Sequence, residues 1–214
     1  MTDLVGKVAI VTGGSRGAGR GIVTALIEAG MSVAAFARDR DTLDELKSSL
    51  GAAAHRCLTV AGDVADEQDV ASLIATVAER FGRLDALINN AGIGAHGTIE
   101  EVPVEQWDRV LAVNLRGPYL CSRAALRLLR ESGGGHIISI GSGAGKQGYA
   151  GMTAYCASKF GLIGLSQALA AEVGDQRIKV TVLNPGTIMT GFGRGGGHGK
   201  VLHPEDVAEA VLYL

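Results

Sequence analysis

The chain has 214 residues, of which 47% are hydrophobic and 20% are charged, and its formal net charge is -2. This length and composition suit one globular domain with a sizeable core, and the scattered basic residues form no patch for nucleic acid. No apolar run approaches the ~18 residues that cross a bilayer, no leader segment opens the chain, and the three cysteines form no CxxC pair. We therefore expect a cytoplasmic protein without membrane or nucleic-acid partners.

Short apolar runs alternate with helical patterns through the first half of the chain. The run KVAIVT at 7–12 is almost wholly apolar and β-branched, which is typical of a strand buried on both faces of a parallel sheet. The segment that follows repeats apolar residues at helical spacing and stops at Gly30, a residue suited to the end of a helix. The same patterns predict further strands at 32–37, 56–60 and 86–88, and helices at 20–30, 41–50 and 66–81.

The alternation continues through the second half. We predict a helical region at 104–131 with an interruption at 116–118, a strand at 136–140, a helix from Tyr155 to Val173, a strand at 179–183 and a helix that opens at Pro204. Six strands, each followed by a helix or by a loop leading to one, predict an α/β fold. This fold is a single-domain, doubly wound parallel sheet over 1–214 with helices on both faces, and its ligand lies beyond the carboxyl ends of the strands.

A glycine-rich loop directly follows the first strand. The sequence TGGSRGAG at 12–19 places Gly13, Gly17 and Gly19 where they permit a tight turn and a close approach of backbone N–H groups to a pyrophosphate. Its spacing differs from the better-known G-x-G-x-x-G pattern. We predict a dinucleotide-binding loop in which Ser15 and Arg16 lie beside the phosphates. The alternative is a plain turn between a strand and a helix.

The end of the second strand bears on the choice of dinucleotide. An acidic residue there accepts hydrogen bonds from the ribose of NAD, but this sequence places Ala37 and Arg38 at that point. A guanidinium offers a bidentate fork for the 2′-phosphate of NADP, and Arg16 offers a second one. We therefore predict NADP(H) over NAD(H). In the alternative reading, both arginines are solvated surface charges and Asp39 binds the ribose.

The stretch TAYCASKFG at 153–161 places a tyrosine four residues before a lysine. On a helix these two positions share one face, so Tyr155 and Lys159 point the same way. A nearby positive charge lowers the pKa of a phenol from its usual value of about 10. The pair is therefore a candidate for acid/base chemistry. The alternative is an amphipathic tyrosine beside a solvated lysine.

Four motifs occur in a fixed order along the chain: TGGSRGAG at 12–19, NNAG at 89–92, Tyr155 with Lys159, and NPG at 184–186. Together they resemble the short-chain dehydrogenase/reductase family, and 3-oxoacyl reductases and related carbonyl reductases within it. The resemblance runs from about residue 7 to the last residue. It implies a Rossmann sheet and reversible hydride transfer between NADP(H) and a small-molecule carbonyl or alcohol, without a metal.

The resemblance also implies catalytic roles. Tyr155 matches the family's general acid/base, and Lys159 matches the lysine that lowers the tyrosine pKa and binds the nicotinamide ribose. Ser142, thirteen residues before the tyrosine, matches the serine that hydrogen-bonds the substrate oxygen; its rival, Ser139, is expected to face the sheet packing. Asn114 matches the asparagine that holds a water for a proton relay, where we expect the long helix to be distorted.

The cofactor contacts implied by the resemblance come from the later strand ends. They comprise Asp63 and Val64 beside the adenine ring, Asn90, Ala91 and Gly92 at the central strand, Pro185 and Gly186 after the sixth strand, and Ile188 and Thr190 at the nicotinamide carboxamide. The two asparagines at 89–90 have an alternative role in shaping a turn. By position, the candidates for the substrate side are His96, Gln147, Tyr149, Met152, Met189 and Phe192, with a short glycine-rich lid at 190–200.

The sequence departs from the family at its end, because the seventh strand expected after the last helix is absent. This places a homotetramer in doubt. The helical segments at 106–130 and 160–173, which form the family's other interface, are intact, so we expect at least a homodimer. One rival function remains open, a redox sensor or scaffold that binds NADP(H) without turnover. The sequence also leaves open whether the substrate is a 3-oxoacyl thioester or a smaller carbonyl compound.

Overall fold

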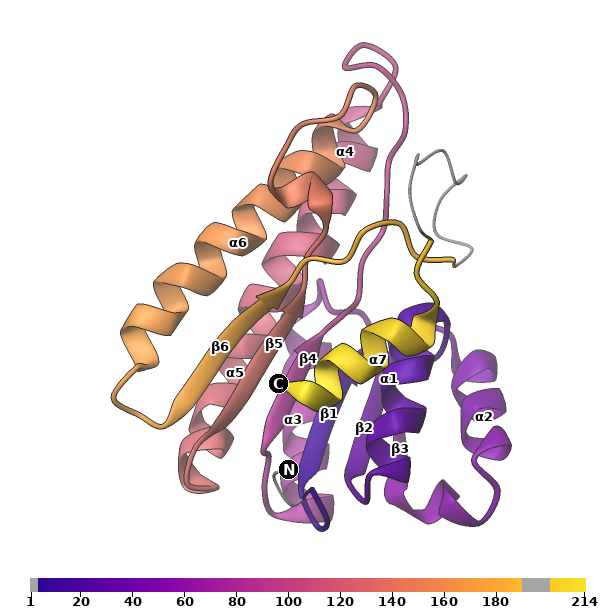
Figure 1. Cartoon of the computed structure of the whole chain (residues 1–214), viewed down its shortest axis with the longest axis vertical. Helices are drawn as coiled ribbons and strands as arrows, with labels where there is room; N and C mark the ends of the chain where they lie inside the picture. Colours follow the sequence, from indigo (N-terminus) through magenta and orange to yellow (C-terminus); the bar gives the residue numbers. More distant parts are fainter. Residues whose placement is uncertain (1–3, 190–200) are drawn as a thin grey trace.

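Six parallel strands form one sheet at the centre of the molecule (Figure 1). The computed structural model describes residues 4–189 and 201–214. The strands are β1 Val8–Thr12, β2 Ser32–Ala37, β3 Cys57–Ala61, β4 Ala86–Asn89, β5 Gly135–Ile140 and β6 Ile178–Leu183. Their order is β3-β2-β1-β4-β5-β6, so the direction of winding reverses between β1 and β4. At such a switch point the loops on either side diverge and leave a crevice for a ligand.

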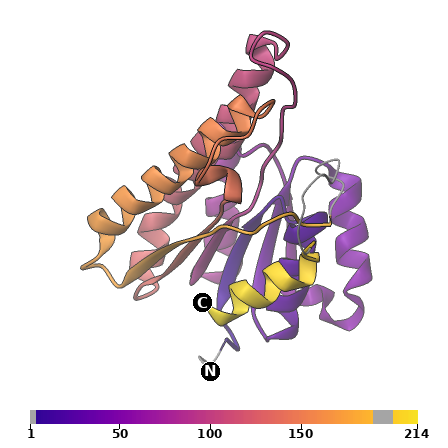
Figure 2. The same cartoon turned by 45° about the horizontal axis from the view of Figure 1, so that its top comes forward.

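Helices cover both faces of the sheet (Figures 1 and 2). One face is covered by α1 Gly17–Glu28, α2 Arg40–Ser49 and α7 Pro204–Tyr213. The other face is covered by α3 Glu67–Phe81, α5 Gly117–Glu131 and α6 Thr153–Val173. The helix α4 Val104–Leu111 lies beyond the strand ends (Figure 1), where its Val110 packs with Ala154 of α6. The 3₁₀ turns η1 Gly51–Arg56 and η3 Gly143–Gly145 and the π-helical turn η2 Ala112–Arg116 complete the described elements. Within the described ranges, no helix is both long and apolar enough to cross a membrane.

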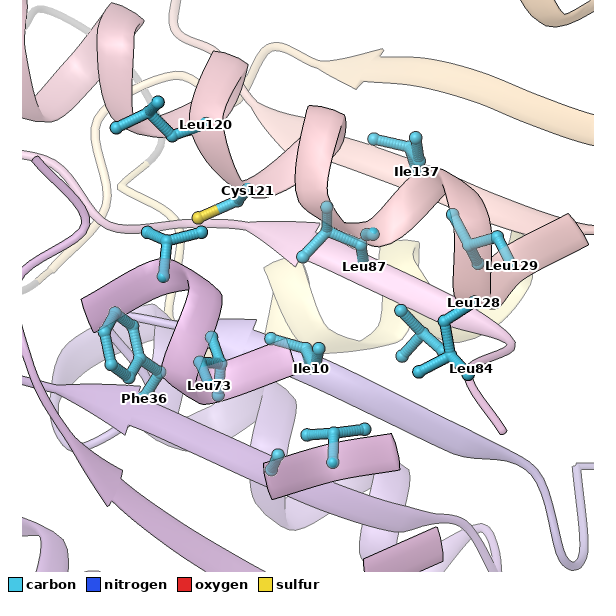
Figure 3. Close-up of a cluster of buried hydrophobic side chains, with 14 of the residues drawn as sticks. Ile10, Phe36, Leu73, Leu84, Leu87, Leu120, Cys121, Leu128, Leu129 and Ile137 are labelled. Atoms are coloured by element: carbon cyan, nitrogen blue, oxygen red, sulfur yellow. The ribbon is translucent and has the colours of Figure 1, made fainter. Parts of the chain in front are cut away.

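Alternate residues of each strand enter two separate cores. Ile10 of β1 packs toward α3 and α5, whereas its neighbour Val11 packs toward α1. Figure 3 shows the first of these cores, where Leu87 of β4 and Leu73 of α3 are fully buried. Each such side chain contributes about 1.5–3 kcal/mol through burial. Burial on both faces explains why the strands read as continuous apolar runs in the sequence.

The predicted fold class is confirmed, and the differences from the predicted elements are local. The first helix begins at Gly17 and not at residue 20, because the last glycines of the loop already form its first turn. The expected interruption of the long helix lies at 112–116, just before the predicted site at 116–118, and takes the form of a π-helical turn. The 3₁₀ turn before β3 was not expected.

Candidate active site

All six strand ends contribute to one cleft with a volume of about 1410 Å³. Almost every predicted site residue lines it, namely Gly13, Ser15, Arg16, Gly17, Arg38, Asp63, Val64, Asn90, Ala91, Gly92, Ser142, Tyr155, Lys159, Pro185, Gly186 and Ile188. Gly19 and Asn114 are buried and are not part of this lining. Thr190 lies outside the described residues. The topology therefore brings together residues that are up to 175 positions apart in the sequence (13 to 188).

The glycine loop and the turn after β4 are hydrogen-bonded across the switch point. The Asn90 side-chain amide donates to the carbonyl oxygens of Thr12, at 2.9 Å, and Gly13, at 3.2 Å. The Thr12 hydroxyl accepts from the backbone N–H groups of Asn90 and Ala91. A Cβ at Gly19 would overlap the Gly13 carbonyl oxygen, so no other residue fits this close approach. Thr12 was not predicted as a site residue, because in the sequence it reads as the last residue of a strand.

The N-terminus of α1 faces this loop. Gly13 and Gly17 have φ angles of 63° and 54°, a left-handed conformation that glycine adopts without strain. Arg16, at the N-cap of α1, makes no side-chain hydrogen bond to the first turn. The first-turn N–H groups and the positive end of the helix dipole therefore offer a place for an anion beside the cleft.

Two arginines line the cleft, Arg16 in the glycine loop after β1 and Arg38 directly after β2. Both residues are exposed. Asp39 forms the N-cap of α2, where its side chain accepts a hydrogen bond from the Thr42 N–H at 3.2 Å. The carboxylate of Asp39 thus caps the helix, and Arg38 presents a cationic group to the cleft at this strand end.

Asp63, directly after β3, is fixed by two donors. One carboxylate oxygen accepts from the Ala65 N–H at 2.9 Å, and the other accepts from the guanidinium of Arg109 in α4. Partial burial acts to raise the pKa of the Asp63 carboxyl, but these two hydrogen bonds and the charges of Arg109 and Arg38 outweigh it and lower the pKa. Arg109 also lines the cleft. The sequence analysis missed it because it lies within a helix and not at a strand end.

Tyr155, Lys159 and Ser142 come together where β5 ends against α6. The tyrosine and lysine side chains share one face of α6 and are 9% and 4% exposed. Ser142 forms a side-chain hydrogen bond with the Tyr155 hydroxyl. The Lys159 ammonium donates to the Ile140 carbonyl oxygen at 2.7 Å and lies 5.6 Å from the centre of the tyrosine ring. The expected grouping of these three residues is present in the structure.

The pKa values in this cluster are governed by burial. Burial raises the pKa of Tyr155, and the hydrogen bond from Ser142 opposes this rise. Burial lowers the pKa of Lys159 to about 8. The sequence predicted that Lys159 would lower the tyrosine pKa, and that lowering is absent from this structure. The physical reason is that the loss of solvation at the phenol is the largest contribution to its pKa.

Asn114 connects the loop after β4 to the tyrosine-bearing turn of α6. It lies in the π-helical turn η2, which confirms the expected distortion at this position. Its side chain accepts from the Ile93 N–H at 2.8 Å, donates to the Ile93 carbonyl at 2.9 Å and donates to the Ser158 hydroxyl at 3.1 Å. Ser158 in turn donates to the Tyr155 carbonyl at 2.7 Å. The sequence analysis missed Ser158, whose only signal is its position three residues after the tyrosine.

A family model described as short chain dehydrogenase matches residues 7–197 of this chain. The chain belongs to this family. Members of the short-chain dehydrogenase family are oxidoreductases that bind a nicotinamide cofactor and act on small molecules.

Relatives of the chain include both dehydrogenases and reductases. A D-threitol dehydrogenase of Mycolicibacterium smegmatis is 36% identical over 99% of this chain and 86% of its own. A 3-oxoacyl-[acyl-carrier-protein] reductase of Synechocystis is 33% identical over 100% of this chain and 91% of its own. The crystal structure of a 3-ketoacyl-(acyl-carrier-protein) reductase from Brucella melitensis complexed with NADH has a TM-score of 0.90 and 31% identity, and the match covers 98% of this chain and 90% of that one.

Two loops meet beyond the strand ends, where the sequence of this short-chain dehydrogenase predicts the substrate side. The Gly97 N–H donates to the Gly151 carbonyl at 3.0 Å and joins the loop after β4 to the loop before α6. Of the residues expected on this side, His96, Tyr149 and Met152 line the cleft. Gln147 and Met189 are not part of its lining. Phe192 and the expected lid at 190–200 lie outside the described residues.

The buried ammonium of Lys159 predicts a pH-dependent difference in stability. Its folded pKa of about 8 lies below the usual 10.5, so between these values the unfolded chain binds more protons than the folded one. Raising the pH from 7 to 10 should therefore stabilise the wild type relative to Lys159→Met, by on the order of 3 kcal/mol at most. Urea unfolding at both pH values measures this. The control is Lys47→Met, because Lys47 is exposed. If the difference in unfolding free energy between the wild type and Lys159→Met did not change with pH, burial of the charge would be contradicted.

Proposed function

We propose that this protein is an NADP(H)-dependent short-chain dehydrogenase/reductase. It transfers a hydride reversibly between the nicotinamide and the carbonyl or alcohol carbon of a small molecule, with Tyr155 as the general acid/base. One observation carries the proposal: a buried tyrosine, hydrogen-bonded to Ser142 and four residues before a buried lysine, lies in the cleft formed by all six strand ends.

The residues of the cleft fit a dinucleotide. The left-handed glycines and the crowded position of Gly19 produce a backbone surface without side chains next to the N-terminus of α1. Such a surface admits a pyrophosphate to within hydrogen-bonding distance of backbone N–H groups. The volume of about 1410 Å³ leaves room for a cofactor together with a substrate. When bound, a nicotinamide cofactor supplies or accepts the hydride.

The proton and the developing charge are handled by side chains of this chain. As hydride reaches a carbonyl carbon, negative charge develops on the substrate oxygen. The Tyr155 hydroxyl donates its proton to that oxygen, and the Ser142 hydroxyl donates a hydrogen bond to it. The Ser142 backbone N–H donates to the side-chain oxygen of Asn184 at 3.2 Å, which holds the serine at the end of β5.

Lys159 and Asn114 support the tyrosine from the interior. With a pKa of about 8, the Lys159 amine is largely protonated at pH 7, so it can hold or pass on a proton beside Tyr155. A Cβ placed on Gly92 would lie 3.5 Å from the Asn114 side-chain oxygen and 3.9 Å from the Lys159 nitrogen. The two polar groups therefore flank the same glycine, an arrangement that supports a proton relay from Tyr155 through Lys159 toward Asn114.

The preference for NADP(H) rests on the two arginines at the rim of the cleft. Arg16 and Arg38 offer two guanidinium groups to a 2′-phosphate. The rival reading assigns the ribose to Asp39, but the side chain of Asp39 already caps α2 through the Thr42 N–H. That cap occupies one acceptor position of the Asp39 carboxylate, whereas both guanidinium groups that line the cleft are donors suited to a phosphate.

Tyr155→Phe tests the acid/base role. The variant removes only the hydroxyl, so it should retain NADPH affinity and lose about 10²- to 10⁴-fold of kcat in NADPH oxidation with a panel of carbonyl compounds. The control is Tyr213→Phe, because Tyr213 is 92% exposed at the end of α7. A near-normal rate in Tyr155→Phe would refute the assigned role. Tight NADPH binding by the wild type without turnover of any compound would instead favour the sensor.

Arg38→Asp tests the cofactor preference. The wild type should bind NADPH at least about tenfold more tightly than NADH, because a charged hydrogen bond to the 2′-phosphate is worth about 1.5–3 kcal/mol. The new carboxylate should repel that phosphate and abolish the preference, as measured by titration of the reduced-nicotinamide fluorescence. Arg127→Asp is the control, because Arg127 is 86% exposed in a pair with Glu131. Equal or tighter binding of NADH by the wild type would overturn the assignment.

We also propose that the chain forms at least a homodimer through α4, α5 and α6. These helices carry a mostly apolar groove of about 560 Å³ lined by Asp108, Leu111, Ala112, Leu115, Arg116, Tyr119 and Leu165. Light scattering should give at least twice the chain mass of 22.0 kDa. Leu165→Glu should yield monomers, because it places a charge in the groove, whereas the exposed loop variant Ile99→Glu should not. A monomeric wild type would contradict the proposal.

A further inference from the structure

Three arginines, spaced seven residues apart, hold the segment from the end of β3 to the first residue of α3. They extend along the nearly continuous helix formed by α4, η2 and α5. Arg109 donates to the Asp63 carboxylate, Arg116 donates to the Ala65 carbonyl, and Arg123 donates to the Glu67 carboxylate. The helix that contains Asn114 is thereby fastened to the strand-end segment that contains Asp63.

Only the first of these contacts belongs to the cleft. Arg109 and Asp63 both line it, and their side chains are 35% and 28% exposed. The pair of Arg123 and Glu67 is 62% exposed at both side chains and is not part of the lining. The two contacts hold the same segment but differ in their access to a ligand, and this difference allows a matched comparison.

The Asp63 carboxylate keeps acceptor capacity toward the cleft. Each carboxylate oxygen can accept about two hydrogen bonds. One oxygen already accepts from the Ala65 N–H and the other from Arg109. About two acceptor positions therefore remain on a carboxylate whose orientation both donors fix.

We propose that Arg109 is a positioning residue for the adenine end of the cofactor, because it holds the Asp63 carboxylate where this accepts a hydrogen bond from the adenine amino group. The inference rests on the proposed function, since it requires a dinucleotide in the cleft. It adds a residue that lies within a helix, 46 positions from Asp63 in the sequence, to the residues that select the cofactor base.

The charges around Asp63 favour a role in which Arg109 holds the carboxylate, over one in which Arg109 competes with adenine for it. Burial disfavours the charged form of Asp63, and the donors around it, among them Arg109, restore that form. An ionised carboxylate is a strong acceptor for the neutral amino group of adenine. Arg109 can stay in place because the carboxylate has positions for both donors. If Arg109 instead occupied the adenine position, its removal would strengthen cofactor binding.

The test compares two bases in four proteins. Dissociation constants of NADPH and of reduced nicotinamide hypoxanthine dinucleotide phosphate are measured by reduced-nicotinamide fluorescence in the wild type, Arg109→Met, Arg109→Lys and Arg123→Met. Hypoxanthine carries an oxygen acceptor in place of the amino donor, so the ratio of the two constants reports the hydrogen bond to Asp63. Thermal unfolding of each variant verifies that it folds.

We expect the wild type to prefer adenine at least about tenfold, the size of one hydrogen bond to a charged group. Arg109→Met should reduce the preference to about twofold through weaker NADPH binding, Arg109→Lys should restore part of it, and Arg123→Met should leave it unchanged. An unchanged ratio in Arg109→Met, or tighter NADPH binding by it, overturns the inference alone. A wild type that binds neither dinucleotide, nor NADH, overturns the proposed function and this inference with it.

Discussion

The burial of the Lys159 ammonium is the constraint on which the site depends. Taking a charge out of water is costly unless polar groups replace the solvent, and the Ile140 carbonyl at the end of β5 provides one such group at 2.7 Å. This contact fixes α6 against β5 and so determines where the face bearing Tyr155 and Lys159 lies. Asn114 then joins the loop after β4 to α6 through its hydrogen bond to Ser158. The need to stabilise the buried Lys159 charge therefore fixes how the end of β5, α6 and the helical turn that contains Asn114 pack together.

The parallel sheet and the helices contribute different parts of the site. All six strands run the same way, so the residues that follow each strand meet at one edge, where backbone and small side chains form the floor of the cleft. Most of the side chains to which the proposed function gives a role come from helices, namely Tyr155 and Lys159 from α6, Asn114 from η2 and Arg109 from α4, whereas Ser142 follows β5.

Periodicity and glycine spacing were enough to predict the sheet, the order of its elements along the chain and the glycine-rich loop, whereas the family resemblance supplied most of the other residues that line the cleft. Contacts between helices and the segments that follow the strands were not predictable in this way. Arg109 lies 46 residues from Asp63 and has no pattern that marks it. The direction of the Tyr155 pKa shift was also missed, because spacing reveals which groups are neighbours but not how deeply each is buried. Depth depends on packing, which residue patterns describe only coarsely.

The distribution of charge in the cleft differs from that of the whole chain. The chain carries a formal net charge of -2, yet the cleft is lined by four cationic side chains, Arg16, Arg38, Arg109 and Lys159, and by two carboxylates, Asp39 and Asp63. Both carboxylates are engaged by backbone N–H groups. An anionic ligand is therefore attracted to the cleft in spite of the overall charge. Such a ligand also favours the protonated form of Lys159, whose pKa burial holds at about 8. Binding of an anionic ligand and protonation of Lys159 are thus linked, because the anion that the cleft attracts also stabilises the buried ammonium.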